Sequence, residues 1–219
     1  ELKLSFRTEE KLYIKSENLF QFKEYLEKKS VKKIHHPRII QSLYFDNLNL
    51  DMYNESIEGL VPRKKIRIRN YPEDNDKKIY FEVKNSSVEG RFKTRKIIDI
   101  KDFEYYKSSG VFDNQYGVCY PKLYVKYVRE YSVLNDVRIS IDKEIKYMDY
   151  KTNIEINDNR IIVELKTSIN KNLDDAVYGS EQAKNQIKHI IAQWINGNNK
   201  GYVFGFEGPP GTGKTTLAK

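Results

Sequence analysis

The chain has 219 residues, of which 39% are hydrophobic and 13% aromatic, enough for one or two packed domains. Its formal net charge of +8 favours an anionic partner such as a phosphate chain, a nucleotide or a nucleic acid. No apolar run reaches the roughly 18–20 residues of a membrane span, no signal peptide is evident, and one cysteine excludes an internal disulfide framework. We therefore expect a cytoplasmic protein without a membrane segment. Because the chain begins with Glu1 rather than Met, we also expect it to be a piece of a longer protein.

Alternation of apolar and polar residues predicts β-strands over most of the first 170 residues. The expected strands cover residues 4–14, 42–45, 64–70, 78–84, a segment starting at Gly90, 123–132, 137–142 and 160–166. Many antiparallel strands at this spacing are typical of a closed or nearly closed sheet. The sequence therefore predicts an α+β domain over residues 1–170, built around one curled sheet.

Helices and turns interrupt these strands. Ser16 is a suitable N-cap for a helix whose apolar residues recur at helical spacing, and a short helix over residues 102–109 ends at Gly110. Residues 35–37, two histidines and a proline, are expected to form a surface loop rather than a metal site, because no third ligand lies at a useful spacing.

The sequence pattern changes after Asn170, and residues 171–219 are expected to begin a second domain. A helical segment at 180–195 precedes a strand at 202–206 and the glycine-rich run GPPGTGKT at 208–215, which fits the P-loop pattern. The glycines let backbone N–H groups wrap phosphates, Lys214 reaches the β and γ oxygens, and Thr215 would hold Mg²⁺. The candidate ATP-binding residues are Gly208, Gly211, Gly213, Lys214 and Thr215.

The polar faces of the predicted strands carry three cations for each acid. The cations are Arg7, Lys11, Lys65, Arg67, Arg69, Lys84, Arg91, Lys93, Arg95, Arg129, Arg138 and Lys166, and the acids are Glu9, Glu82, Asp142 and Glu164. A merely solvated sheet face is the alternative, but such faces usually mix signs because like charges facing each other destabilise a sheet. The excess therefore favours bound phosphates, with the carboxylates free to hold Mg²⁺ or Mn²⁺.

Seven short motifs occur along these strands in a characteristic order. They are RTEEK at 7–11, SLYFDN at 42–47, RIR at 67–69, FEVK at 81–84, VRE at 128–130, VRISID at 137–142 and VELK at 163–166. Together they resemble the VTC-type polyphosphate polymerase domain of the triphosphate tunnel metalloenzyme (CYTH-like) superfamily, over residues 2–167.

The resemblance implies an antiparallel β-barrel tunnel with flanking helices, which binds triphosphates with a divalent metal. In the VTC branch the γ-phosphate of ATP is transferred to a growing polyphosphate chain. By motif, the residues implied to bind phosphate are Lys11, Arg67, Arg69, Lys84, Lys93, Arg129, Arg138 and Lys166. Glu164 would be the principal metal ligand and Glu9 a weaker one, and Arg95 is an alternative to Lys93.

The segment GPPGTGKTTLAK, with residues 173–184, is similar to the opening of an AAA+ ATPase domain of a somewhat Lon-like kind. The resemblance covers residues 173–219 and implies a partial α/β P-loop NTPase segment, whose other catalytic motifs would lie beyond Lys219. It also implies ATP as ligand, and AAA+ modules commonly form oligomers.

Two other functions fit the same tunnel. A triphosphatase would hydrolyse inorganic triphosphate, thiamine triphosphate or an RNA 5′-triphosphate end, but hydrolases of this kind usually begin with a Glu-x-Glu pair, and Arg7 stands where the first acid would be. A non-catalytic sensor would bind polyphosphate or nucleotide and regulate the ATPase. General nucleic-acid binding is less favoured, because the cations point into a concave face rather than interleaving with exposed aromatic platforms.

Overall fold

The computed structural model describes residues 7–87, 90–135 and 137–168, with the side chains at 7–10, 90–91 and 167–168 outside this description. The elements are β1 (Arg7–Ile14), the 3-10 helix η1 (Ser16–Asn18), α1 (Leu19–Lys28), β2 (Lys32–Asp46), α2 (Asp51–Glu58), β3 (Arg63–Asn70), β4 (Ile79–Ser87), β5 (Gly90–Ile98), α3 (Ile100–Ser109), β6 (Val111–Asp113), β7 (Gly117–Leu134), β8 (Val137–Asp149), β9 (Glu155–Asp158) and β10 (Ile161–Ser168). None of the helices within these ranges has both the length and the hydropathy needed to cross a membrane.

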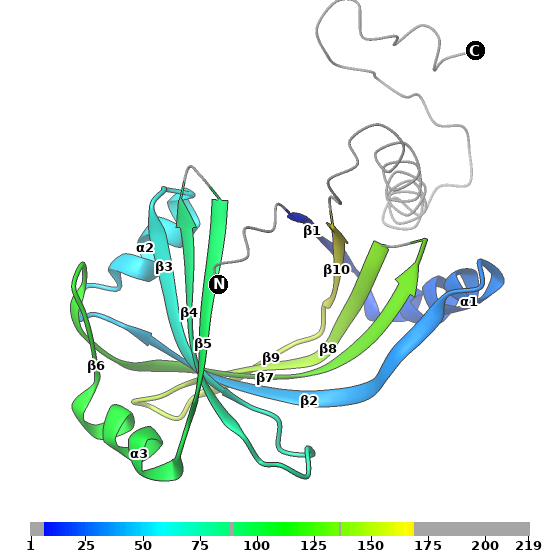
Figure 1. Ribbon diagram of the computed structural model, residues 1–219. Coiled ribbons are helices and arrows are strands. Elements are labelled where there is room, and N and C mark those ends of the chain that lie inside the picture. Colours follow the sequence, from blue (N-terminus) through cyan, green and yellow to red (C-terminus); the bar gives the residue numbers. More distant parts are fainter. Residues whose placement is uncertain (1–6, 88–89, 136, 169–219) are drawn as a thin grey trace, which may run out of the picture.

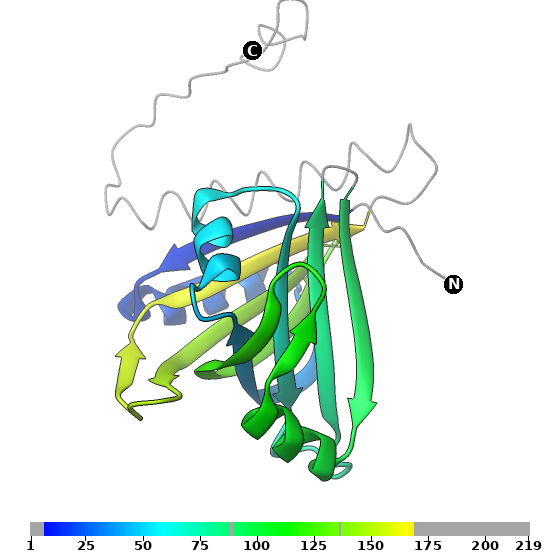
Figure 2. The ribbon, with the colours of Figure 1, turned by 90° about the vertical axis from the view of Figure 1, so that its left-hand side faces the viewer.

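The strands form one antiparallel sheet in the order β1-β10-β8-β7-β2-β3-β4-β5, with β6 added to β7 and β9 to β8. Figure 1 shows the sheet curled into a trough, with β3, β4 and β5 on one side and β1, β10 and β8 on the other. Figure 2 shows that β3, β4 and β5 run across the direction of β1, β10 and β8. The predicted α+β fold with an antiparallel tunnel-like sheet is confirmed. In the described part of the chain, β1 and β5 are not paired with each other, so curvature rather than hydrogen bonding brings the two sides together.

Two apolar clusters pack against the outer side of the sheet. On one side, Phe22 and Leu26 of α1 pack with buried residues of β1, β8 and β10, such as Val163. On the other side, Met52 of α2 and Phe103 of α3 pack with residues of β2, β3 and β4. Because the apolar half of each alternating strand is covered in this way, the polar half faces the trough.

The predicted loop at residues 35–37 is wrong, because these residues lie within β2, a strand of 15 residues. The pairing of β2 with β7 shifts register between Lys33 and His35 and again between His35 and Arg38. Such bulges accept an extra residue, so Pro37, which lacks an N–H donor, does not end the strand. The segment predicted as a short strand at 42–45 is the end of this long one.

Helix α2 and strands β6 and β9 have no counterpart among the predicted elements. Helix α2 follows Leu50, whose φ of 59° places it in the left-handed region. The carboxylate of Asp46 accepts hydrogen bonds from the backbone N–H groups of Met52 and Tyr53, at 3.1 and 2.9 Å. A buried acid five residues before the start of the helix thus satisfies two of its free N–H groups, and Asn47 Oδ1 accepts from a third, that of Asp51, at 3.0 Å.

We expect Gly110→Ala to destabilise the domain by about 3 kcal/mol, because a left-handed φ costs about 1–2 kcal/mol and crowding a further 1–3. Gly110 has φ +80°, and an added Cβ would lie 2.8 Å from Val118 Cγ1 and 2.9 Å from the Cys119 carbonyl oxygen. Gly59→Ala is the control for a positive φ without crowding, because its φ is +72° and nothing lies within 4 Å, although its ψ is 17° and that of Gly110 is −179°. Urea unfolding of both variants measures the difference, and equal losses would contradict the packing argument.

Candidate phosphate-binding site

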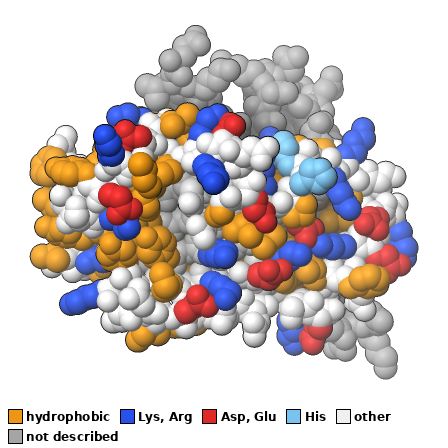
Figure 3. Space-filling view, turned by 90° about the horizontal axis from the view of Figure 1, so that it is seen from below, with side chains coloured by type: hydrophobic (Ala, Val, Ile, Leu, Met, Phe, Trp, Pro, Cys, Tyr) orange, Lys and Arg blue, Asp and Glu red, His pale blue; other side chains and the backbone are white. Residues whose placement is uncertain are grey.

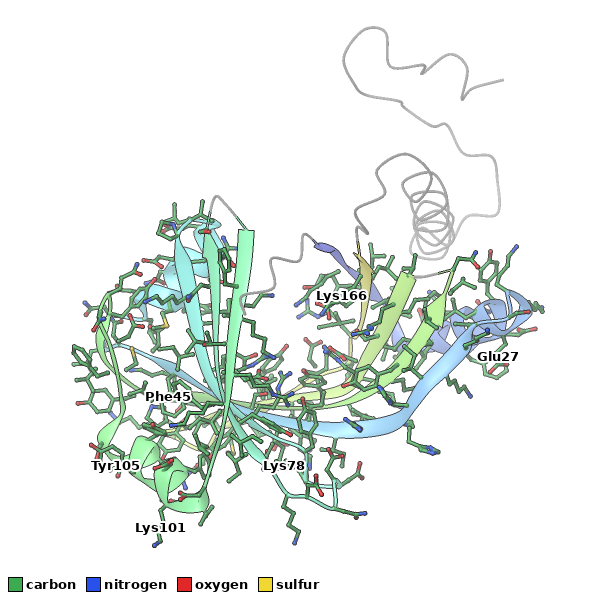
Figure 4. The ribbon with its side chains drawn as sticks, in the orientation of Figure 1. Glu27, Phe45, Lys78, Lys101, Tyr105 and Lys166 are labelled. Carbon is green, nitrogen blue, oxygen red and sulfur yellow. The ribbon has the colours of Figure 1, made fainter. Side chains whose placement is uncertain are left out.

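The concave side of the sheet, here called the inner face, carries the predicted basic residues. Of the twelve cations, the ten with described side chains are Lys11, Lys65, Arg67, Arg69, Lys84, Lys93, Arg95, Arg129, Arg138 and Lys166. Neighbouring strands place them directly opposite one another: Lys65 pairs with Lys84, and Lys84 with Lys93. Figure 4 shows Lys166 in the trough, while Lys101 and Tyr105 lie on α3 away from it. The structure therefore brings the predicted phosphate-binding side chains together on one concave surface.

Glu82, on β4, is the centre of a charge cluster on this face. Its side chain is 2% exposed and its two oxygens accept hydrogen bonds from Arg67 Nε at 2.8 Å and Lys93 Nζ at 2.6 Å. Arg95 Nε lies 3.2 Å from Oε1 of the same carboxylate. One buried acid therefore contacts and orients three cations from β3 and β5. Both Lys93 and Arg95, which the motifs could not tell apart, belong to the inner face.

A second cluster lies on the opposite side of the trough, on β7, β8 and β10. Arg129 donates two hydrogen bonds to Asp142, at 2.5 and 2.6 Å, in a bidentate pair. Arg129 Nη2 also lies 3.8 Å from Glu164 Oε2. The same carboxylate oxygen lies 3.1 Å from Lys166 Nζ and 3.5 Å from Ser140 Oγ. Asp142 and Glu164 are therefore coupled through one guanidinium group.

Hydroxyl groups that the motifs gave no role fix Arg67 and Arg69 of β3. Arg67 donates to the Tyr44 hydroxyl at 3.0 Å. Arg69, which is 6% exposed, donates to Ser42 Oγ at 2.9 Å and to the Tyr127 hydroxyl at 3.1 Å. The sequence does indicate that Ser42 and Tyr44 lie on the same face of a strand, because they are two residues apart. This spacing alone does not show which arginine each hydroxyl group contacts.

Burial and neighbouring charges shift the pKa values of several groups on this face, among them Glu82 and Lys65. Burial would raise the pKa of Glu82, but Arg67 and Lys93 outweigh it, and the pKa is lowered. For Lys65, desolvation lowers the pKa, and the like charges of Lys11 and Lys84 lower it further. Because Lys11 is on β1 and Lys65 on β3, the two sides of the trough are close enough to interact electrostatically.

The predicted metal ligands were Glu164 and Glu9. Glu164 is buried on the inner face, whereas the side chain of Glu9 lies outside the described residues, although its backbone pairs with Lys166 of β10. In the ranges that the structure describes, no three His, Cys, Asp or Glu residues cluster as they would around a metal ion. Two carboxylates, those of Asp142 and Glu164, do lie on either side of Arg129. Oxygen donors of this kind suit Mg²⁺ or Mn²⁺, which take their remaining ligands from phosphate and water.

The P-loop residues Gly208, Gly211, Gly213, Lys214 and Thr215 lie outside the described residues, so their predicted role stays a prediction.

Comparison with known proteins identifies the family. The chain matches the VTC domain over residues 6–196, and it therefore belongs to the VTC domain family. The match passes residue 170, so the predicted boundary between residues 1–170 and 171–219 stays a prediction.

Two solved structures share the fold at low sequence identity. A putative adenylate cyclase from Bacillus halodurans is 13% identical with a TM-score of 0.53, over 82% of this chain and 88% of that one. A chain of the Schizosaccharomyces pombe Mediator head module is 8% identical with a TM-score of 0.52, over 86% of this chain and 96% of that one. These likenesses show the fold alone.

A short match concerns a different kind of protein. The chain is 42% identical over 53 residues, 24% of its length, to a Lon protease homolog of Acanthamoeba polyphaga mimivirus. The match spans only 5% of that protein.

We expect Glu82→Gln to destabilise the domain by about 2 kcal/mol at pH 7, because three partly exposed cations lose a shared buried counter-charge. The effect depends on pH. Since the folded-state pKa of Glu82 lies below its ordinary value of 4.5, its contribution is complete above that value and is lost as the pH falls through the folded-state pKa.

Urea unfolding at pH 7 and at decreasing pH tests this expectation. The difference between Glu82→Gln and the parent protein should shrink below pH 4.5. Glu24→Gln is the control, since Glu24 forms an exposed helical pair with Lys28 and its loss should cost at most about 0.5 kcal/mol. A difference that is constant down to acid unfolding would exclude the charge as its cause.

Proposed function

We propose that residues 1–170 form a metal-dependent phosphotransferase, which moves the γ-phosphate of ATP onto a polyphosphate chain, and that an AAA+ ATPase domain follows it. Membership of the VTC domain family supports the first part. The short Lon-like match and the P-loop motif support the second.

The observation that carries the proposal is the arrangement of three arginines. Arg67 is held by Glu82 and Tyr44, Arg69 by Ser42 and Tyr127, and Arg129 by Asp142. Arg129 also lies with its guanidinium carbon 5.2 Å from the Tyr127 ring centre, which places it beside the partner of Arg69. Planar guanidinium groups fixed in this way match phosphate oxygens with little loss of side-chain entropy on binding.

Phosphoryl transfer requires mainly positioning and charge stabilisation from the protein. The arginines would bind and orient the triphosphate, and the lysines of the inner face would add positive charge along the phosphate chain. Glu164 and Asp142, with Glu9 on the neighbouring strand, are the residues that would hold Mg²⁺ or Mn²⁺. When bound, the metal would offset the charge of the phosphate oxygens.

We expect Arg67→Gln to weaken the binding of inorganic tripolyphosphate at least tenfold, because a charge-assisted contact contributes about 1.5–3 kcal/mol. Glu82 keeps Lys93 and Arg95 as partners, so the variant should fold. The control Lys101→Gln removes the same charge from the exposed surface of α3 and should have less than a twofold effect. Calorimetric titration measures both. Equal effects of the two substitutions would mean that only net charge matters.

The reaction itself is tested by incubating the protein with ATP and Mn²⁺, then staining gels for polyphosphate and measuring phosphate release. We expect long polymer, lost by at least a hundredfold in Glu164→Gln because Gln keeps the shape of the side chain but not its charge. Lys214→Ala should leave polymer formation unchanged, because Lys214 belongs to the P-loop. Thermal unfolding of each variant checks that the domain remains folded.

Other outcomes would replace the proposal. Phosphate release that depends on Glu164 but yields no polymer would identify a triphosphatase that uses water as acceptor. Polyphosphate binding with neither product would identify a sensor that regulates the ATPase.

A further inference from the structure

We propose that one end of the trough binds the nucleoside part of a nucleoside triphosphate through a stack of arginine and tyrosine side chains. The inference rests on the proposed function, because it places the donor nucleotide on the inner face. It adds the direction in which the nucleotide lies and the residues that recognise its base.

The stack consists of two tyrosines and two arginines from three strands and the turn after β3. The Arg95 guanidinium carbon lies 3.5 Å from the Tyr80 ring centre, and Tyr80 meets Tyr71 edge to face at 5.9 Å. The Arg38 guanidinium carbon also lies 5.8 Å from the centre of the Tyr71 ring. Arg38 and Arg95 keep 39% and 41% of their side-chain surface exposed. Guanidinium planes and tyrosine rings with an open side are the surfaces on which nucleobases stack.

The stack is continuous with the phosphate-binding residues. Arg95 contacts Tyr80 with its guanidinium plane and Glu82 with Nε, at 3.2 Å, so it joins the aromatic stack to the charge cluster around Arg67. Tyr71 packs against the buried cluster of Ile40, Tyr127 and Ile145, and the hydroxyl of Tyr127 holds Arg69. A base on this stack would therefore leave its phosphates directed toward Arg67 and Arg69.

A pocket of about 540 Å³ beside Tyr71 provides room at this end. The turn between β3 and β4 and the end of β5 form its walls, which include Pro72 and Ile97 together with Asp76 and Lys78. Apolar walls with charges of both signs suit an uncharged base and ribose, which need contact area and hydrogen bonds rather than net positive charge.

The other end of the inner face has the opposite character. Lys65 of β3 faces Lys84 of β4 in the sheet, and Lys11 of β1 is close enough to lower the pKa of Lys65. Three cations in this position favour the phosphate chain over the nucleoside. The trough therefore has a direction, with the base at the tyrosine end and the phosphates extending toward the lysine end.

The test compares two ligands, MgATP and inorganic tripolyphosphate, which differ in the nucleoside. Calorimetric titrations use the whole 219-residue chain with Lys214→Ala, so that the P-loop does not contribute a second ATP site. Tyr71→Leu removes the aromatic ring but keeps an apolar side chain, and Arg38→Gln removes the guanidinium group beside Tyr71. Tyr53→Leu is the control, because Tyr53 is 57% exposed on α2, away from the stack.

We expect Tyr71→Leu and Arg38→Gln each to weaken MgATP binding about tenfold and tripolyphosphate binding less than twofold. Tyr53→Leu should change neither. If the parent protein binds both ligands and neither variant changes the ratio of the two affinities, the nucleoside site is refuted while the phosphate site stands. If the parent protein binds neither ligand, the proposed function fails and this inference fails with it.

Discussion

The trough depends on three buried carboxylates that offset part of the charge of a face rich in cations. Like charges on neighbouring strands repel each other, and ten described basic side chains share the inner face. Glu82 offsets the β3–β5 side, and Asp142 and Glu164 offset the β7–β10 side. Each acid contacts more than one cation or shares a cation with a neighbouring acid. Three carboxylates therefore stabilise a larger number of basic side chains. The face can therefore fold without a bound anion and still keep a net positive charge with which to attract one.

Local patterning explains which parts of the fold were predictable. Alternation with a period of two identified β3, β4, β8 and β10 because it reflects only which side of a strand is covered. The full length of β2 could not be predicted, since it depends on pairing with β7 through bulges that place Pro37 in an extended strand. Helix α2 was also missed, because its first N–H groups are satisfied from Asp46 and Asn47, outside the positions where capping residues are normally sought.

The site was predictable in its residue types but not in its contacts. Twelve cations on strand faces pointed to phosphate from charge alone, and the motifs added their order along the chain. Which acid neutralises which cation depends on register between strands: Glu82 pairs with Arg95 directly and reaches Lys93 along the diagonal. For this reason the motifs could treat Glu82 only as one acid among four. The structure shows that Glu82 holds Arg67, the first arginine of RIR, and both basic candidates of β5, Lys93 and Arg95. The stack of Tyr71, Tyr80 and Arg95 is likewise a product of pairing, because its members lie in a turn and two strands.

The outer edge of β5, which is unpaired among the strands that the structure describes, has a consequence for behaviour at high protein concentration. Its outer backbone groups do not pair with β1 in the described residues, and an unpaired strand edge is a template for joining the sheet of another molecule. Natural proteins discourage this contact with charged side chains, above all lysine, on the edge strand. The sequence of β5, GRFKTRKII, has such a run in Arg91, Lys93, Arg95 and Lys96. The cations that would attract phosphate thus also protect the molecule from edge-to-edge aggregation, and neutralising them would lower solubility as well as anion binding.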